Sequence, residues 1–300
     1  MNYAKGLQIR EVVKLALRED IGRNDITTAL VIPKDKPAKA VLLAKENFIV
    51  CGLDVACFVF SLLDKKIKFK PAVSEGQYIR KGEIIARIEG KAASILTAER
   101  TALNFLSFLS GIATKTREYV NAVKPYKVKI VDTRKTIPGL RQLQKYAVKT
   151  GGGYNHRMRL DEMVLIKDNH IKVIRAPLRL RSGQAGHQVT SVENTVKDIR
   201  RKIPKGMKVE IEVENLKQFK EALKEKPDII MLDNMKIEDI RKAVSIIHNT
   251  QYSIRNTLLE ASGGITLKNV KKFAAAGVDM ISIGALTHSV NSVDISLDFL

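Results

Sequence analysis

Side chains that can bind anions gather in one stretch of the sequence, from Asp132 to His170. Its cationic set surrounds a Gly-Gly-Gly turn and consists of Arg134, Lys135, His156, Arg157 and Lys167. Members of the set follow apolar runs such as VKIVDTRK and MVLIKD, where buried strands end and active sites open. Arginine pairs with carboxylates through two parallel hydrogen bonds, and lysine acts as a point charge. The spacing predicts a pocket for an anion with more than one negative charge.

Two carboxylates lie at the ends of successive apolar runs further along the chain. Glu212 follows VEI, and Asp233 ends DIIMLD. Such a pair can hold Mg²⁺ directly or through water, or orient sugar hydroxyls. Glu210 and Glu214 share a strand face with Glu212, so some of these acids can simply pair with the cations. The sequence has no pair of histidines at the i, i+4 spacing of a helical zinc site and no G-x-S-x-G nucleophile motif.

Glycines follow the last two apolar runs. The segment ASGGI contains Ser262, Gly263 and Gly264, and SIGA contains Gly284. Glycine lets backbone N–H groups approach an anion ahead of a helix. Both segments therefore predict a phosphate site.

The elements that must position these residues alternate between two patterns. Strand-like runs are KVKIVDT, MVLIKD, KVEIEVE, DIIMLDN, TLLEASG and DMISIGAL, and helical segments such as LKQFKEALKEK and IEDIRKAVSIIHN lie between them. This order, with nearly continuous apolar strands, predicts a parallel sheet covered by helices. Because an α/β barrel gathers its chemistry at the carboxyl ends of its strands, six polar strand ends favour a barrel over an open sheet.

The first part of the chain has a different pattern. A helix is expected from about Gln8 to Glu19, followed by the polar turn IGRNDITT. Short apolar runs between residues 38 and 89 predict a small, mostly antiparallel sheet, with a helix near Leu53–Leu63. A long helix is expected from about Ser94 to Val123, with a break near Gly111.

Together these patterns predict an α/β protein of two domains. Residues 1–112 form an α+β sheet domain and residues 113–300 an α/β-barrel catalytic domain, whose last residues can pack back on the first. The segment Ile174–Gln188 has weak periodicity, contains arginines but no acid, and interrupts the barrel pattern. It is predicted to be a surface insertion.

Composition limits the class of protein. An apolar content of 45% over 300 residues is typical of a folded chain. The sequence has no apolar run near the roughly 20 residues that span a bilayer, and its acid-containing start is unlike a signal peptide, so we expect a cytoplasmic protein. Cys51 and Cys57 are too few for a disulfide framework or metal site, and buried thiols are expected. The net charge of +20 fits polyanionic substrates, since dispersed lysines and 5% aromatic residues argue against nucleic acid.

The ordered motifs resemble the quinolinate phosphoribosyltransferase family, the decarboxylating nicotinate-nucleotide pyrophosphorylases. They are DTRKTIPGLR, KTGGGYNHR, LIKDNH, EVEN, MLDN, ASGGI and GALTHS. ALREDIGRNDITT and AERTALNFLSFLSGIAT are also similar to the family, with Asn24 where a glycine is common. The resemblance covers nearly the whole chain except about Ile174–Gln188.

The resemblance implies a fold and a reaction. The fold is an open-faced sheet domain joined to a type II phosphoribosyltransferase-like barrel, in a homodimer with shared active sites. The reaction converts quinolinate and phosphoribosyl pyrophosphate to nicotinate mononucleotide, pyrophosphate and CO₂ in de novo NAD biosynthesis. It would use Mg²⁺ and no redox cofactor, and neither nucleic acid nor a membrane would be a partner.

The resemblance also implies roles for particular residues. The quinolinate carboxylates and the pyrophosphate would be bound by Thr133, Arg134, Lys135, His156, Arg157 and Lys167. Arg100 matches the arginine that reaches into the partner subunit's site. Glu212 and Asp233 match the pair near the ribose and magnesium and, with Lys135, would be catalytic. The 5′-phosphate cradle would be formed by Ser262, Gly263, Gly264, Ile283, Gly284 and Ala285.

Two alternatives belong to other functions. One is a related pyrophosphorylase associated with molybdenum transport, or a relative that uses nicotinate; the intact LIKDNH and GALTHS motifs argue against both. The other is a basic nucleic-acid-binding protein that kept the fold and lost catalysis. Retention of the cationic set and of both acids argues against it.

Overall fold

The computed structural model describes residues 7–175, 192–249 and 256–300. The chain divides into two compact units, each built from several segments. The first unit comprises residues 1–118, 135–155 and 284–300, and the second comprises residues 119–134 and 156–283. The boundary expected after residue 112 stays a prediction, and residues 176–188 of the predicted insertion lie outside the described residues.

The first unit contains the predicted antiparallel sheet, whose strand order is β12-β1-β5-β3. Its strands are β1 (Pro37–Ala44), β3 (Lys68–Pro71), β5 (Ile84–Lys91) and β12 (Ile295–Phe299). Two short strands, β2 (Phe48–Ile49) and β4 (Tyr78–Ile79), pair separately. The last strand thus pairs with β1, although the two are far apart in the sequence.

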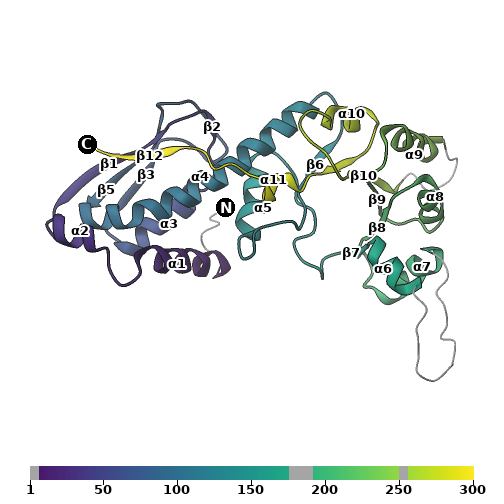
Figure 1. The fold of residues 1–300 in the computed structure, drawn as a ribbon, viewed down its shortest axis with the longest axis horizontal. Coiled ribbons are helices and arrows are strands. Elements are labelled where there is room, and N and C mark those ends of the chain that lie inside the picture. Colours follow the sequence, from purple (N-terminus) through teal and green to yellow (C-terminus); the bar gives the residue numbers. More distant parts are fainter. Residues whose placement is uncertain (1–6, 176–191, 250–255) are drawn as a thin grey trace, which may run out of the picture. The chain divides into compact units, whose positions relative to one another are not determined.

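The helices of the first unit supply its apolar core. They are α1 (Leu7–Ile21), α2 (Ile26–Val31), α3 (Leu53–Leu63), α4 (Ala92–Val123), α5 (Arg141–Thr150) and α11 (Ala285–His288). Figure 1 shows α3 and α4 running along the sheet of β1, β3 and β5. Leu42, Phe60 and Leu106 are fully buried there. The turn predicted at IGRNDITT is wrong in part, because Asp25 accepts a hydrogen bond from the Thr28 N–H (3.0 Å) and caps α2.

Helix α4 corrects the predicted break near Gly111, because it continues through that residue. A Cβ atom at Gly111 would lie 2.1 Å from the carbonyl oxygen of Asn291. The glycine therefore allows the segment before β12 to pack against the helix backbone. Of the helices in the described part of the chain, α4 included, none is long and apolar enough to cross a membrane.

The second unit contains a six-stranded parallel sheet in the order β6-β11-β10-β9-β8-β7. The strands are β6 (Lys129–Val131), β7 (Val164–Ile166), β8 (Val209–Val213), β9 (Ile229–Asp233), β10 (Leu258–Ser262) and β11 (Met280–Ser282). Five strands follow one another in chain order, and the first, β6, pairs with the last, β11. This cyclic order is that of the predicted barrel, although within the described residues β6 and β7 form the two edges.

Helices cover one face of this parallel sheet. They are α6 (Asp168–Arg175), α7 (Val192–Lys202), α8 (Leu216–Lys224), α9 (Ile237–Asn249) and α10 (Val270–Ala275). Figure 1 shows α8 and α9 beside β8 and β9, where α8 contacts both strands. Side chains such as Ile211, Ile230 and Phe219 are buried in this layer.

The opposite face of β8, β9 and β10 carries the acids of these strands, because side chains alternate along a strand and Ile211 and Ile230 point to the helices. The strand register places Glu212 beside Met231, Met231 beside Glu260, and Asp233 beside Ser262. We call this surface the acidic face and define it by Glu210, Glu212, Asp233, Glu260 and Ser262.

Candidate functional site

The end of the acidic face brings together two predicted carboxylates, Glu212 and Asp233. Both are half-buried. Burial and the negative charge of Asp233 raise the pKa of Glu212, while the positive charge of Lys167 opposes the shift. Lys167 follows β7 and is exposed. The two acids and this cation therefore lie close enough to influence one another.

This pair of acids fits a divalent cation. Carboxylate oxygens are the ligands that Mg²⁺ prefers, and a cation between the two groups would relieve their repulsion. The repulsion is visible in the raised pKa of Glu212, to which Asp233 contributes. The two carboxylates are ligands that would suit Mg²⁺, and the magnesium site stays a prediction.

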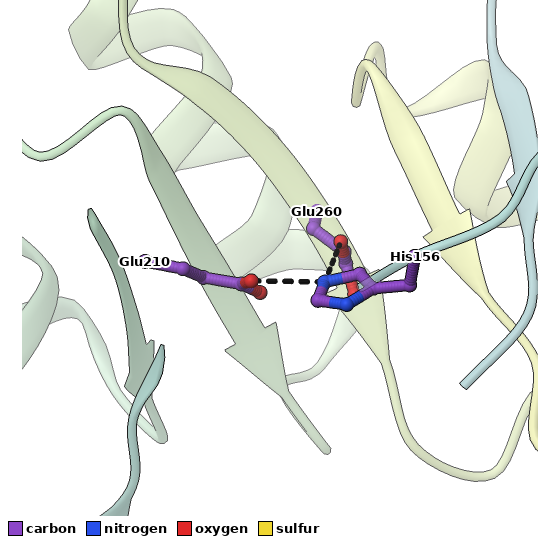
Figure 2. Close-up of side chains that lie close together, drawn as sticks. All are labelled: His156, Glu210 and Glu260. Carbon is purple, nitrogen blue, oxygen red and sulfur yellow. Dashed lines mark hydrogen bonds and ion pairs between the residues drawn. The ribbon is translucent and has the colours of Figure 1, made fainter. Parts of the chain in front are cut away.

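A second cluster lies deeper on the acidic face and is formed by His156, Glu210 and Glu260. The His156 ring lies between the carboxylates of Glu210 on β8 and Glu260 on β10 (Figure 2). Its Nε2 is 2.9 Å from Glu210 Oε2 and 3.6 Å from Glu260 Oε2. The backbone N–H of His156 donates to Asp132 Oδ1 at 2.9 Å, just beyond β6. Three different strands therefore hold this histidine.

Burial makes it unfavourable for both carboxyl groups of this cluster to be charged at once. Glu210 and Glu260 are both fully buried. Burial, followed by the charge of Glu210, raises the pKa of Glu260 well above that of an ordinary carboxyl, and His156 only partly opposes this. One oxygen of Glu210 and both oxygens of Glu260 have no hydrogen-bond partner among the described residues. Two buried carboxylates this close favour retaining a proton.

The same three residues are the one His/Cys/Asp/Glu cluster in the described ranges whose donor atoms lie close enough for a shared metal ion, within 4.8 Å. The separation of 2.9 Å between Nε2 and Oε2 is that of a direct hydrogen bond. A proton between nitrogen and oxygen therefore accounts for this geometry better than a metal ion does.

Two arginines of the cationic set lie near this cluster. Arg157 is half-buried and donates from Nη1 to the carbonyl oxygen of Met163 at 2.8 Å. Burial and the positive charge of Arg134 lower the pKa of Arg157, and Glu210 opposes this. Arg134 follows β6 with Thr133, and both are half-buried. Two neighbouring guanidinium groups that repel each other favour binding of an anion with two charges.

Lys135 belongs to the first unit, where it lies beside Gly284. The Thr287 hydroxyl donates to the Lys135 carbonyl oxygen at 2.7 Å, and the Gln144 amide donates to the Thr287 carbonyl oxygen at 2.6 Å. A Cβ atom at Gly284 would lie 3.0 Å from both Lys135 Cδ and His288 Nε2. The lysine stem and the histidine ring thus flank the glycine that precedes Ala285 and α11.

The other predicted phosphate segment, Ser262–Gly264, forms a turn after β10. Gly263 and Gly264 have φ angles of 92° and 62°, a region that favours glycine. The side-chain amide of Asn269 donates to the Gly264 carbonyl oxygen at 3.0 Å. Ile283 is buried, and its N–H donates to the Val131 carbonyl oxygen at 2.9 Å, so its backbone extends the sheet.

The triple glycine has a packing role. A Cβ atom at Gly151 would lie 2.5 Å from the Ala113 carbonyl oxygen, and one at Gly153 would lie 2.8 Å from the Thr116 methyl group. Arg117 donates from Nε to the Gly151 carbonyl oxygen at 2.8 Å. The turn therefore packs against α4 within the first unit, whereas His156 belongs to the second.

Arg100 is exposed on α4 and lines a groove of about 660 Å³ in the first unit. The groove combines acids, such as Glu19 and Asp20, with aromatic side chains, such as Phe105 and Phe108. Arginine and aromatic side chains are the types enriched at protein interfaces, whereas acids are depleted there.

Sequence reasoning missed some residues that surround the predicted site. Glu260 was not singled out, although a lone acid inside the apolar run LLEAS is a signal, since buried acids are rare. Gln144 beside Lys135 was also missed, and no role was predicted for Thr287 or His288 of the GALTHS motif. The expectation that an acid of VEIEVE pairs with a cation is confirmed in part by Glu210, whose partner is the ring of His156.

Family models match both parts of the chain. The model described as "Quinolinate phosphoribosyl transferase, C-terminal domain" matches residues 112–298. The model for the N-terminal domain of the same family matches residues 25–110. The two matches meet close to residue 112.

Curated proteins and solved structures are similar along nearly their whole length. A probable nicotinate-nucleotide pyrophosphorylase (carboxylating) of Methanocaldococcus jannaschii is 43% identical, and the alignment covers 97% of this chain and 96% of that protein. The nicotinate-nucleotide pyrophosphorylase (carboxylating) of Mycobacterium leprae is 38% identical over 96% of each. The crystal structure of NadC from Streptococcus pyogenes has a TM-score of 0.87 at 38% identity, covering 98% of this chain and 97% of that one.

Proposed function

Because the chain belongs to the quinolinate phosphoribosyltransferase family, we propose how its side chains divide the work of that reaction. The protein is a decarboxylating phosphoribosyltransferase of NAD biosynthesis. It joins quinolinate to the ribose phosphate of phosphoribosyl pyrophosphate and releases pyrophosphate and CO₂. The observation that carries this function is the match to both family domains at about 40% identity to full-length relatives.

Quinolinate, a dicarboxylate, binds to the cationic set of the second unit. Arg134 and Arg157 are supported as its main partners by their mutual repulsion, which a dianion would relieve. The ring of His156, held by Glu210 and Glu260, orients one carboxylate. Thr133 and Lys167 complete the set.

Phosphoribosyl pyrophosphate binds through its three charged or polar parts. Glu212 and Asp233 hold the ribose and would bind Mg²⁺, directly or through water. The bound cation would supply positive charge against the pyrophosphate. The turn Ser262–Gly264 and the backbone at Ile283, Gly284 and Ala285 bind the 5′-phosphate. Lys135, whose backbone is fixed by Thr287, provides a point charge for the pyrophosphate.

In the chemical step, the bond between ribose C1 and the pyrophosphate oxygen breaks, and its electron pair leaves with pyrophosphate. Glu212 and Asp233 stabilise the positive charge that develops on the ribose. The quinolinate nitrogen then forms the bond to C1 and becomes cationic. The C2 carboxylate leaves as CO₂, its electron pair remains at C2 beside that nitrogen, and a proton takes its place. These steps pass no electrons to or from an external carrier, so no redox cofactor is required.

The assembly is a homodimer in which Arg100 completes the partner subunit's site. The exposure of Arg100 and the aromatic side chains of the groove that it lines support this. Mixing an Arg100→Ala chain with a Lys135→Ala chain should restore part of the activity, because one of the two sites would regain both residues. If no mixture recovers any activity, sharing of the site is wrong.

The reaction is tested with purified protein, both substrates and Mg²⁺. Pyrophosphate and CO₂ should be released in equal amounts, and a chelator should stop the reaction until Mg²⁺ is restored. Nicotinate in place of quinolinate is the control. Equal use of nicotinate would contradict the assignment, because nicotinate has no C2 carboxylate to lose.

The proposed location is the cytoplasm. Plant relatives carry mitochondrial or chloroplastic locations in their names, so location varies among similar proteins. Fractionation of the source cells, followed by an assay for quinolinate-dependent pyrophosphate release, tests this. Activity confined to a membrane or organelle fraction would contradict the proposal.

A further inference from the structure

Asn234 has an unusual backbone conformation beside the site. Its φ angle is 53°, and within the described residues only Lys226 and Asn234 combine a positive φ with a side chain. This region is unfavourable for most residues with a Cβ atom and is tolerated best by asparagine and aspartate after glycine. Something in the structure must therefore hold Asn234 in place.

The backbone of Asn234 joins the ends of two strands. Its N–H donates to the carbonyl oxygen of Ser262 at 2.9 Å. The preceding residue, Asp233, is already the register partner of Ser262 in the pairing of β9 with β10. In a parallel ladder, one residue of each pair bonds to the residues on either side of its partner, so this hydrogen bond is the last of the β9–β10 ladder. It ends at Ser262, the first residue of the segment predicted to bind phosphate.

The side chain of Asn234 contacts Asp233 and lies against Gly263. Its Nδ2 donates to Asp233 Oδ2 at 2.8 Å. Its Oδ1 occupies the space beside Gly263, where a Cβ atom would lie only 2.2 Å away. One amide group thus contacts the carboxylate of the predicted ribose site and fills the space over the glycine turn.

The geometry points to Asn234 as a positioning residue that couples Asp233 to the Ser262–Gly264 turn. The amide fixes the direction of the Asp233 carboxylate through Nδ2, and the backbone N–H fixes the start of the turn. The ribose and the 5′-phosphate of one substrate are then bound at a set separation. This inference rests on the proposed function, since it concerns phosphoribosyl pyrophosphate and not quinolinate.

The test replaces Asn234 with glycine, which accepts a positive φ and keeps the backbone N–H but removes the amide. With one charge-assisted hydrogen bond lost, the KM and the Kd for phosphoribosyl pyrophosphate should rise about tenfold. The KM for quinolinate should stay within about twofold. Asn234→Asp should be worse than Asn234→Gly, because a second carboxylate would face Asp233.

Lys226→Gly is the matched control, since it changes the other positive-φ residue, in the turn after α8. It should leave both KM values unchanged. The Kd is measured by titration calorimetry with Mg²⁺ and without quinolinate, and the melting temperature of each variant is measured in parallel.

The outcomes separate the two proposals. An Asn234→Gly variant with unchanged KM and Kd for phosphoribosyl pyrophosphate, or with both KM values raised equally, overturns the coupling and leaves the proposed function intact. A wild-type protein that releases no pyrophosphate from the two substrates overturns the proposed site and the coupling together. A rise confined to phosphoribosyl pyrophosphate supports the coupling.

Discussion

The two sheets of this protein differ in the side chains that they bury: one buries apolar groups and the other also buries carboxylates. In the antiparallel sheet of the first unit, the fully buried positions of β1 and β5 include Leu42, Ile85 and Ile88. In the parallel sheet of the second unit, the acidic face includes two fully buried carboxylates, Glu210 and Glu260. Burying an apolar side chain stabilises a fold, whereas burying a carboxylate costs free energy unless it is neutralised.

The difference suggests that the first sheet mainly supplies stability and that the acidic face mainly supplies chemistry. The apolar sheet contributes free energy that hardly depends on pH. The acidic face holds groups whose charge depends on their neighbours, and we propose that Glu212 and Asp233 among them act on a cationic reaction centre. Substitutions of buried residues in the first unit should therefore change stability without changing turnover. Substitutions on the acidic face should change turnover with little change in stability, or should change how stability depends on pH.

The largest effect is expected for Phe60→Ala in the first unit. Phe60 is fully buried on α3 and stacks on Phe69 with ring centroids 5.8 Å apart. Removing the ring should lower the free energy of unfolding by about 3–5 kcal/mol, as measured by chemical denaturation. The kcat/KM of the protein that remains folded should be unchanged. Leu62→Ala, at an exposed position of the same helix, is the control, and a similar loss there would break the comparison.

Next in size is Asp233→Asn on the acidic face. It removes the negative charge proposed to stabilise the positive charge that develops on the ribose, so kcat should fall about 10²–10³-fold by analogy with the loss of one electrostatic group from an active site. The melting temperature should change little. Asp239→Asn on α9 is the control, because Asp239 pairs with Lys242 away from the acidic face. Unchanged turnover in Asp233→Asn would remove this residue from the chemistry.

A pH-dependent effect is expected for Glu260→Gln. The folded state raises the pKa of Glu260, so between the ordinary carboxyl pKa and the raised value the unfolded chain releases a proton that the folded protein keeps. Stability therefore falls as pH rises through this window. The variant lacks this loss, so its melting temperature should fall less than that of the wild type between pH 5 and pH 8, by about a few degrees. Parallel curves for the two proteins would contradict the buried-acid argument, and the exposed Glu238→Gln should give a curve parallel to wild type.

The smallest effect is expected for Asp25→Ala in the first unit. The Asp25 carboxylate caps α2 through the Thr28 N–H and also accepts from the Thr97 hydroxyl at 3.0 Å. Its loss should cost about 0.5–2 kcal/mol of stability and leave kinetics unchanged. Hydrogen bonds with Thr28 lower the pKa of Asp25, so the difference from wild type should disappear as pH falls below the ordinary carboxyl range. Asp25→Asn should retain most of the stability at neutral pH, and equal loss in both variants would argue against capping.

The features that the sequence predicted are those that depend on neighbouring residues along the chain, such as strand ends and helices. The ends of the parallel strands could be read because a polar residue follows each apolar run, as at Asp233 and Ser262. The confirmed helix α3 has a clear apolar face between a glycine and an aspartate. Such local patterns indicate the element type where no long-range contact opposes them.

Long-range contacts account for what the sequence did not predict. The environment of Glu260 depends on His156, which lies on another segment of the chain. The break expected at Gly111 was wrong because close packing against Asn291 outweighs the low helix propensity of glycine. The sequence predicted the triple glycine to be part of an anion pocket. Its close approach to α4 depends on residues far away in the sequence, so no local pattern predicts it.

The pairing of β12 with β1 has a consequence for the order in which the chain matures. During synthesis, β1 leaves the ribosome before the parallel strands and β12 leaves after them, so the edge of the first sheet stays open while the parallel strands are made. An unpaired edge is a template for association with other chains. In a nascent chain this edge of β1 is therefore open to other chains until β12 pairs with it.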